Sequence, residues 1–148
     1  MADTKAEAKA ETIGGGGGGS GSFSEQAFVE KLNKLNNTAT RIQTLSNWCI
    51  FHRKRARKVV DTWEKQYNSA NKDKKVSFLY LSNDILQNSK RKGGEFVNEF
   101  WRVLPGLLKD FYVNGGEDGK KVVGRLYYEL VASVKSISFC LHAQIVDG

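Results

Sequence analysis

The sequence has few of the residues that join small proteins covalently or through metals. Its two cysteines, Cys49 and Cys140, lie far apart in apolar surroundings, and the only histidines are His52 and His142. This set offers neither a disulfide framework nor a credible group of zinc ligands, so we expect both cysteines to be small core residues. A chain of 148 residues has room for one domain of ordinary size with its own hydrophobic core.

Long hydrophobic runs are also missing. No apolar stretch approaches the roughly 20 residues that a membrane-spanning helix needs, and the N-terminus has no apolar region of the signal-peptide kind. These features predict a soluble, intracellular protein with no membrane partner.

Motifs of catalysis are scarce as well. The poly-Gly run follows a polar leader, and the segment GGEDGKK lacks the spacing of a phosphate-binding loop. No Ser-His-Asp or Cys-His set is suggested, and no paired histidines or carboxylates stand at metal-ligand spacing. The sequence therefore predicts a protein that is not an enzyme and has no cofactor or metal.

What the sequence has in excess is positive charge. The formal net charge is +7, and residues 1–22 and 127–148 each hold one more acidic than basic residue. The central part of the chain therefore carries +9. Such a balance predicts an acidic partner, which could be nucleic acid, a phosphorylated peptide or an anionic membrane.

The chain divides into three parts by composition. Residues 1–22 are polar and then rich in Gly and Ser, which predicts a disordered leader. From Phe23 onward apolar residues recur at helical spacing, and the fold class is predicted to be all-α. Seven to eight short helices joined by tight turns would stack as a bundle or a right-handed superhelix. The domain proper is expected to span residues 23–126, with a different tail over 127–148.

Local signals predict where these helices begin and end. Ser24 can cap the first helix, with Phe23 placed to staple its entry. The segments NKDKK and NGGEDG are expected to be turns, and the pair Gly93-Gly94 is expected to end a helix that starts near Lys75. Pro105, the only proline, is expected to break the helix that follows.

One predicted helix, residues 75–90, has two distinct sides. At about 100° per residue its large apolar residues fall on one side, which is the expected core side. On the opposite side lie an aromatic ring, a carboxylate, an amide and a cation, with a second amide at the flank. This set consists of Tyr80, Asp84, Gln87, Arg91 and Asn88. Its composition suits a peptide-binding surface, and an ordinary solvated helix face is the alternative.

Two further features are more ambiguous. The run HRKRARK at residues 52–58 is either a solvated face or a contact for RNA or for nuclear import. Trp48, Trp63 and Trp101 each lie within an apolar helical pattern, and all three are expected in the core.

Two segments carry a resemblance to a known family. SFSEQAFVEKLNKLNNTATRIQTLSNWCIFHRKRARKVVDTW and FLYLSNDILQNSKRKGGEFVNEFW closely resemble the RNA polymerase II CTD-interacting domain (CID), above all the subgroup in regulators of nuclear pre-mRNA domain-containing proteins. The resemblance covers roughly residues 22–126, and YLSNDILQNSKRKG is its most specific element. It implies a right-handed superhelix of eight helices, similar to VHS and ENTH modules, whose second, fourth and seventh helices line a groove.

The resemblance also implies a function and the residues that perform it. The protein would act in the nucleus, in transcription and pre-mRNA processing, by binding the phosphorylated heptad repeats (Tyr-Ser-Pro-Thr-Ser-Pro-Ser) of the largest polymerase subunit. Asp84 resembles the acceptor for the heptad tyrosine hydroxyl, and Tyr80 the ring that packs on the heptad prolines. The remaining positions resemble peptide contacts (Asn37 and Asn88), the arginine that meets phosphate on the first heptad serine (Arg125) and secondary basic contacts (Lys90 and Arg91).

The resemblance ends after Leu126. There the family pattern N-I-W-x-E-R-x-V-F is replaced by YYELVASVKSISFCLHAQIVDG, whose Val, Ser, Ile and Phe favour strand as much as helix. The second half of helix seven and helix eight are therefore expected to differ from the family. An altered reading of the transcript, such as an alternative splice end, is one explanation.

Two rival functions follow from the same features. The helical superhelix and basic surface would also suit a membrane-trafficking adaptor of the VHS or ENTH kind, although the Gly-rich leader lacks a lipid-inserting amphipathic helix. An RNA-binding module using HRKRARK is the second rival, and steep salt dependence of RNA binding would distinguish it.

Overall fold

A computed structural model describes residues 23–133, and every regular element within this range is helical. This confirms the all-α prediction. The leader 1–22 and residues 134–148, with Cys140 and His142, lie outside the described residues. The elements in chain order are α2 (Glu25–Asn33), α3 (Ala39–Phe51), the 3₁₀ turn η1 (Arg53–Arg55), α4 (Ala56–Ser69), α5 (Lys72–Ser89), α6 (Glu95–Asn114) and α7 (Gly116–Ser133).

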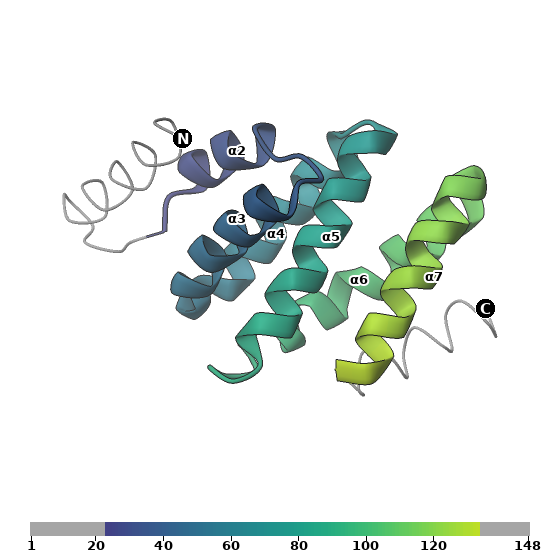
Figure 1. The fold of residues 1–148 in the computed structure, drawn as a ribbon. Helices are drawn as coiled ribbons and strands as arrows, with labels where there is room; N and C mark the ends of the chain where they lie inside the picture. Colours follow the sequence, from purple (N-terminus) through teal and green to yellow (C-terminus); the bar gives the residue numbers. More distant parts are fainter. Residues whose placement is uncertain (1–22, 134–148) are drawn as a thin grey trace.

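The helices form two layers, as Figure 1 shows. In the front layer α3 packs on α5 and α5 on α7, and α4 and α6 lie behind them. The helix α2 packs on α4, and α4 packs on α6. The chain passes from one layer to the other at each turn, so the helices within a layer run in the same direction. Because α5 also contacts α4 and α6, it is the central helix of the fold.

The first helix begins as the sequence predicted. The Ser24 hydroxyl oxygen accepts a hydrogen bond from the Ala27 amide at 3.2 Å, and the Phe23 ring lies 5.9 Å from that of Phe28. The cap satisfies one of the amides that a helix start leaves without an intrahelical partner, and the ring pair fixes the angle of entry.

The expected turn NKDKK is instead the start of α5. Asn71 is the N-cap of this helix, and its side-chain oxygen accepts a hydrogen bond from the Lys74 amide at 2.9 Å. Asp73 in the first turn adds a negative charge at the positive end of the helix dipole. Capping therefore outweighs the polar composition that suggested a turn.

The expected break at Pro105 was also wrong, because α6 continues through it from Glu95 to Asn114. A proline inside a helix removes one hydrogen bond and costs about 3 kcal/mol. Pro105 is buried beside Leu104 and Leu108, which are both at most 1% exposed. Burial of this continuous apolar side offsets the lost hydrogen bond.

The expected turn NGGEDG is shorter than predicted, because a single residue, Gly115, separates α6 from α7. A Cβ atom on Gly115 would lie 2.5 Å from the carbonyl oxygen of Phe111, and Gly116 has a positive φ of 69°. Only glycine fits both positions, and this lets α7 fold back directly onto α6.

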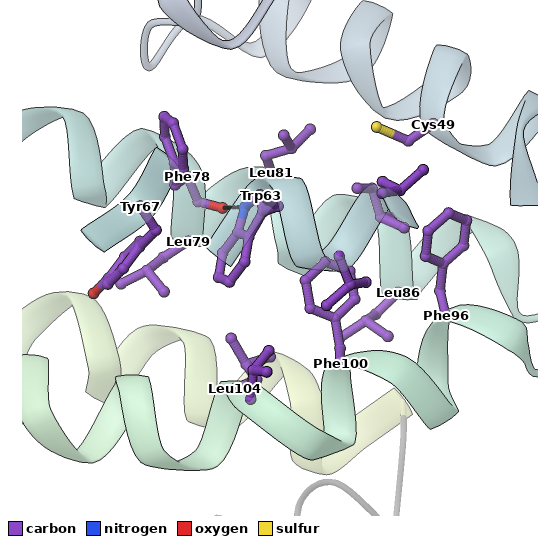
Figure 2. Packing of buried hydrophobic residues seen from close by; sticks show 14 of the residues in the cluster. Cys49, Trp63, Tyr67, Phe78, Leu79, Leu81, Leu86, Phe96, Phe100 and Leu104 are labelled. Atoms are coloured by element: carbon purple, nitrogen blue, oxygen red, sulfur yellow. Dashed lines mark hydrogen bonds between the residues drawn. The ribbon is translucent and has the colours of Figure 1, made fainter. Parts of the chain in front are cut away.

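A buried indole connects α4 to α5 at the centre of the core, as Figure 2 shows. The Trp63 indole N–H donates a hydrogen bond to the Phe78 carbonyl oxygen at 3.1 Å, and the Trp63 side chain is fully buried. Its ring stacks on Tyr67 at 5.4 Å and meets the edge of Phe100 at 5.2 Å. Burial raises the pKa of the Tyr67 phenol.

The three tryptophans do not share one environment. Trp63 is a core residue as predicted, and Trp48 is partly buried against the core, 5.5 Å from Phe28. Trp101 is 39% exposed, so its predicted place in the core was wrong. It follows Phe100 directly, and a rotation of about 100° per residue turns it away from the apolar centre of α6. Cys49 is buried, as predicted.

The Trp63 bond gives a first test of this fold. The change Trp63→Phe removes the buried donor, leaves a small cavity and takes away the second hydrogen bond of the Phe78 carbonyl, which keeps its partner within α5. We expect it to lower the free energy of unfolding by about 2–4 kcal/mol, measured by urea denaturation. The matched control Trp101→Phe should change it by less than about 0.5 kcal/mol. Equal effects of the two changes would contradict the roles given to these residues.

Candidate functional site

The buried and the accessible residues of α5 lie on the two opposite sides that the helical spacing predicted. The core side is at most 2% exposed and consists of Phe78, Leu79, Leu81, Ile85 and Leu86. On the opposite side Tyr80 and Asp84 are half-buried, while Asn88 and Arg91 are exposed. The Tyr80 ring also packs against the edge of the core. We call the set Tyr80, Asp84, Gln87, Asn88 and Arg91 the α5 stripe. The α5 stripe is accessible, and the core holds the helix that carries it.

Asp84 and Asn88 form a pair one helical turn apart. The Asn88 side-chain amide donates to the Asp84 carboxylate oxygen Oδ2 and to the Asp84 backbone oxygen, both at 3.0 Å. Within residues 23–133 the other carboxylate oxygen, Oδ1, accepts no hydrogen bond. Asn88 thus orients the Asp84 carboxylate, and Asp84 Oδ1 stays open to a donor from outside the chain.

Asn37 reaches α5 from the connection between α2 and α3. Its side-chain oxygen accepts a hydrogen bond from the Ser77 hydroxyl, and Ser77 lies three residues before Tyr80 on the same helix. The structure therefore brings Asn37 to the start of the α5 stripe, although the two are 40 residues apart in the chain.

A lysine holds the same connection in place. The Lys74 ammonium donates to the backbone oxygens of Asn33 at 2.8 Å and Leu35 at 2.6 Å. Partial burial lowers the pKa of this amino group. Lys74 thereby satisfies carbonyls at the end of α2 and positions the loop that carries Asn37.

On its other side α5 is aligned with α7 by two polar contacts. Near the starts of the helices, Lys72 Nζ lies 3.8 Å from Asp118 Oδ2. Eleven residues further along both helices, the Asn83 amide donates to Glu129 Oε1 at 3.3 Å. Both pairs are separated by 46 residues in the chain. The helices therefore run parallel and in step, as Figure 1 also shows.

This alignment locates Arg125. The same offset places Arg125 level with Leu79 and Tyr80 on α5. Glu129, four residues later, faces α5, since its backbone oxygen accepts from Gln87 at 3.1 Å. Residues four apart share one side of a helix, so Arg125 also lies on the side of α7 that adjoins α5.

Arg125 is exposed and forms no salt bridge within residues 23–133. Two acids, Glu117 and Asp118, lie in the first turn of the same helix, and Asp118 pairs with Lys72 instead. The guanidinium is therefore available to an anion.

The two residues predicted as secondary basic contacts lie at the far end of the stripe. Lys90 is the C-cap of α5 and Arg91 follows it, and both are exposed. Gln87 is less available than the helical pattern suggested, because it donates to Asn83 and to the Glu129 backbone.

Sequence reasoning missed the residues that support this face, namely Lys74, Ser77, Asn83 and Glu129. Each of them bonds across two helices or to a loop, and no local pattern signals such a contact. Glu129 lies in the part of the chain expected to depart from the family. It is nevertheless helical, and Leu130 beside it is 1% exposed.

Among residues 23–133 no three His, Cys, Asp or Glu side chains are grouped in a way that could hold a metal ion. In the same range no helix is long and apolar enough to span a membrane.

The fold and this face define a helical module without strands in its described part, and comparison with known proteins gives its family. The family model for the CID domain matches residues 26–129. This range is more than half of the chain, and the chain belongs to the CID domain family.

Known relatives narrow the similarity further. Over 105 residues the chain is 44% identical to human Regulation of nuclear pre-mRNA domain-containing protein 1A and 45% identical to the human protein 1B. These alignments cover 71% of this chain, but only 34% and 32% of the relatives. CID domain-containing protein 1 of Caenorhabditis briggsae is 26% identical over 107 residues, which are 72% of this chain and 34% of that protein. The chain thus spans about a third of the length of these relatives.

Proposed function

We propose that this domain binds the phosphorylated heptad-repeat tail of RNA polymerase II, with a preference for phosphate on the first serine of the heptad. It would act in the nucleus as a regulator of transcription and pre-mRNA processing. The observation that carries the proposal is the arrangement of Asn37, the α5 stripe and the exposed Arg125 on one face formed by α3, α5 and α7. Family membership and the names of the relatives, which refer to nuclear pre-mRNA, support it.

The helices of this face are those that the family resemblance singles out. They are the second, the fourth and the last α-helix of the described residues, because the expected fifth and sixth helices are one helix, α6. All three belong to the front layer. An extended peptide lying across them would meet Asn37 from one side and Arg125 from the other.

Asp84 provides the acceptor in this scheme. Its carboxylate is half-buried and oriented by Asn88, and the free oxygen Oδ1 can accept a hydrogen bond from the heptad tyrosine hydroxyl. The Tyr80 ring, one turn earlier, offers an apolar surface to a proline. Asn37 and Asn88 can bond to the peptide backbone or its hydroxyl groups.

Arg125 provides the phosphate contact. A planar guanidinium can hold a phosphate with two charge-assisted hydrogen bonds, which a lysine ammonium cannot reproduce. Because Arg125 is level with Tyr80, a peptide whose tyrosine reaches Asp84 would carry the phosphate on the next residue close to α7. That residue is the first serine of the heptad.

Asp84→Asn tests the acceptor. We expect it to weaken binding of a heptad peptide by about 1.5–3 kcal/mol, because a charged acceptor is lost from the site, while circular dichroism stays unchanged. Asp110→Asn, on α6 outside the front layer, is the matched control and should leave peptide affinity unaltered. Calorimetric titration measures both. A folded Asp84→Asn protein with unchanged affinity would remove Asp84 from the binding site.

Arg125→Ala tests phosphate selectivity. We expect a loss of roughly 1.5–3 kcal/mol toward a peptide phosphorylated on the first heptad serine and a much smaller loss toward the unmodified peptide. Arg125→Lys should recover only part of the loss, and the control Lys120→Ala on the same helix should keep the wild-type ratio of the two affinities. Equal weakening of both peptides would indicate structural damage rather than a phosphate contact.

A further inference from the structure

A second charged surface lies away from Asn37, Asp84 and Arg125. Five of the six residues from Arg53 to Lys58 are basic, and they form η1 and the first turn of α4. Arg53 is half-buried, and the other four are exposed. No acidic residue occurs in the first turn of α4. Cations at a helix start oppose the helix dipole, so this cluster does not stabilise α4.

Few carboxylates neutralise these cations. Arg57 Nε lies 3.9 Å from Asp61, but the same carboxylate is held more closely by Arg102 at 2.9 Å. Lys54, Arg55 and Lys58 form no salt bridge within the part of the chain that the structure describes. The surface therefore keeps most of its positive charge.

The last residue of α3 adds an aromatic ring to this surface. The Phe51 side chain is 68% exposed, directly before the cations, and its ring meets the edge of His52 at 5.0 Å. Removing an exposed phenyl ring from water is favourable, so a ligand that covers Phe51 gains binding free energy. Beside positive charge, it suits a ligand that combines anionic groups with flat rings.

Three more cations adjoin the cluster. α3 and α5 run side by side, and η1 contacts α6, which begins just after Lys90, Arg91 and Lys92. The end of α3 and the end of α5 therefore lie at the same end of the molecule, visible at the lower left of Figure 1. We call this surface the basic end; it consists of Phe51, Arg53, Lys54, Arg55, Arg57, Lys58 and Lys92, while Lys90 and Arg91 adjoin it and remain secondary contacts of the peptide proposal. Glu95 is the exposed acid that follows it.

The basic end is separated from the phosphate contact. Phe51 lies fourteen residues after Asn37 on the α3 side of the front layer, which corresponds to about 20 Å at 1.5 Å per residue. Arg125 lies on α7, on the opposite side of α5 from α3. A peptide at Tyr80 and Asp84 therefore leaves Phe51 and η1 uncovered.

We propose that the basic end binds single-stranded RNA. Its cations match a phosphodiester backbone, and Phe51 can stack on a base that a duplex would keep in its own stack. This binding is independent of the proposed peptide recognition, so a protein that does both would hold a phosphorylated peptide and an RNA strand at the same time.

The test uses the full chain and a fluorescent twelve-nucleotide single-stranded RNA of mixed sequence, with anisotropy measured at several salt concentrations. The double variant Lys54→Glu/Arg55→Glu should weaken RNA binding at least tenfold. The loss of two phosphate contacts should also reduce the slope of log affinity against log salt by about 1.4. Phe51→Ala should weaken binding about tenfold with little change in this slope, because it removes stacking rather than charge.

The matched control is Lys65→Glu/Lys120→Glu, which makes the same change of net charge at exposed positions near the opposite end. It should alter RNA affinity less than threefold. A heptad phosphopeptide should bind wild type and Lys54→Glu/Arg55→Glu equally well, so that failure of the peptide proposal remains distinguishable. Circular dichroism checks that each variant is folded.

Three results would overturn the RNA proposal. The first is no RNA binding by the wild-type chain at low salt. The second is an equal loss in the two double variants, which would show a diffuse charge effect. The third is displacement of the RNA by the phosphopeptide together with weakening by Arg125→Ala, which would place the RNA on the α5 stripe. Binding of phosphatidylserine vesicles in place of RNA would count with the first result.

Discussion

The hydrogen bond from the Trp63 indole to the Phe78 carbonyl fixes the rotation of the central helix, and the site depends on that rotation. The bond is buried, so breaking it would leave the indole N–H without a partner in an apolar core. It joins α4 of the second layer to α5 of the front layer, within an aromatic group that includes Phe100. With Phe78 held on the core side, Tyr80 and Asp84 must lie on the other side of α5.

The neighbours of α5 complete the face through polar contacts rather than through the core. The Ser77 hydroxyl donates a hydrogen bond to Asn37 in the loop before α3, and the Asn83 side-chain amide donates one to Glu129 of α7. Together, the Asn83–Glu129 and Lys72–Asp118 contacts fix how α7 is aligned along α5, and this alignment places Arg125 beside Tyr80. Side chains on helices that are tethered in this way need little reordering when a peptide binds, which favours affinity.

Sequence reasoning correctly predicted the features of this structure that interactions between residues close in the chain determine. The Ser24 cap, the burial of Cys49 and the division of α5 into two sides follow from side-chain chemistry and helical spacing. It went wrong where burial outweighed a local preference, as at Pro105, or where a helix faced solvent, as at Trp101. The contact between Ser77 and Asn37 and the alignment of α7 with α5 depend on tertiary packing, which no local pattern encodes. The identity of the proposed peptide ligand came from the family resemblance and not from the stripe alone.

The most direct test of the central claim is a nuclear magnetic resonance titration of the ¹⁵N-labelled chain with a heptad peptide phosphorylated on the first serine. The account predicts that the largest amide shifts gather at Asn37, at Tyr80 through Asn88, and around Arg125, with much smaller shifts around Arg125 for the unmodified peptide. Shifts concentrated at Phe51–Lys58, or shifts equally strong around Arg125 with either peptide, would contradict it.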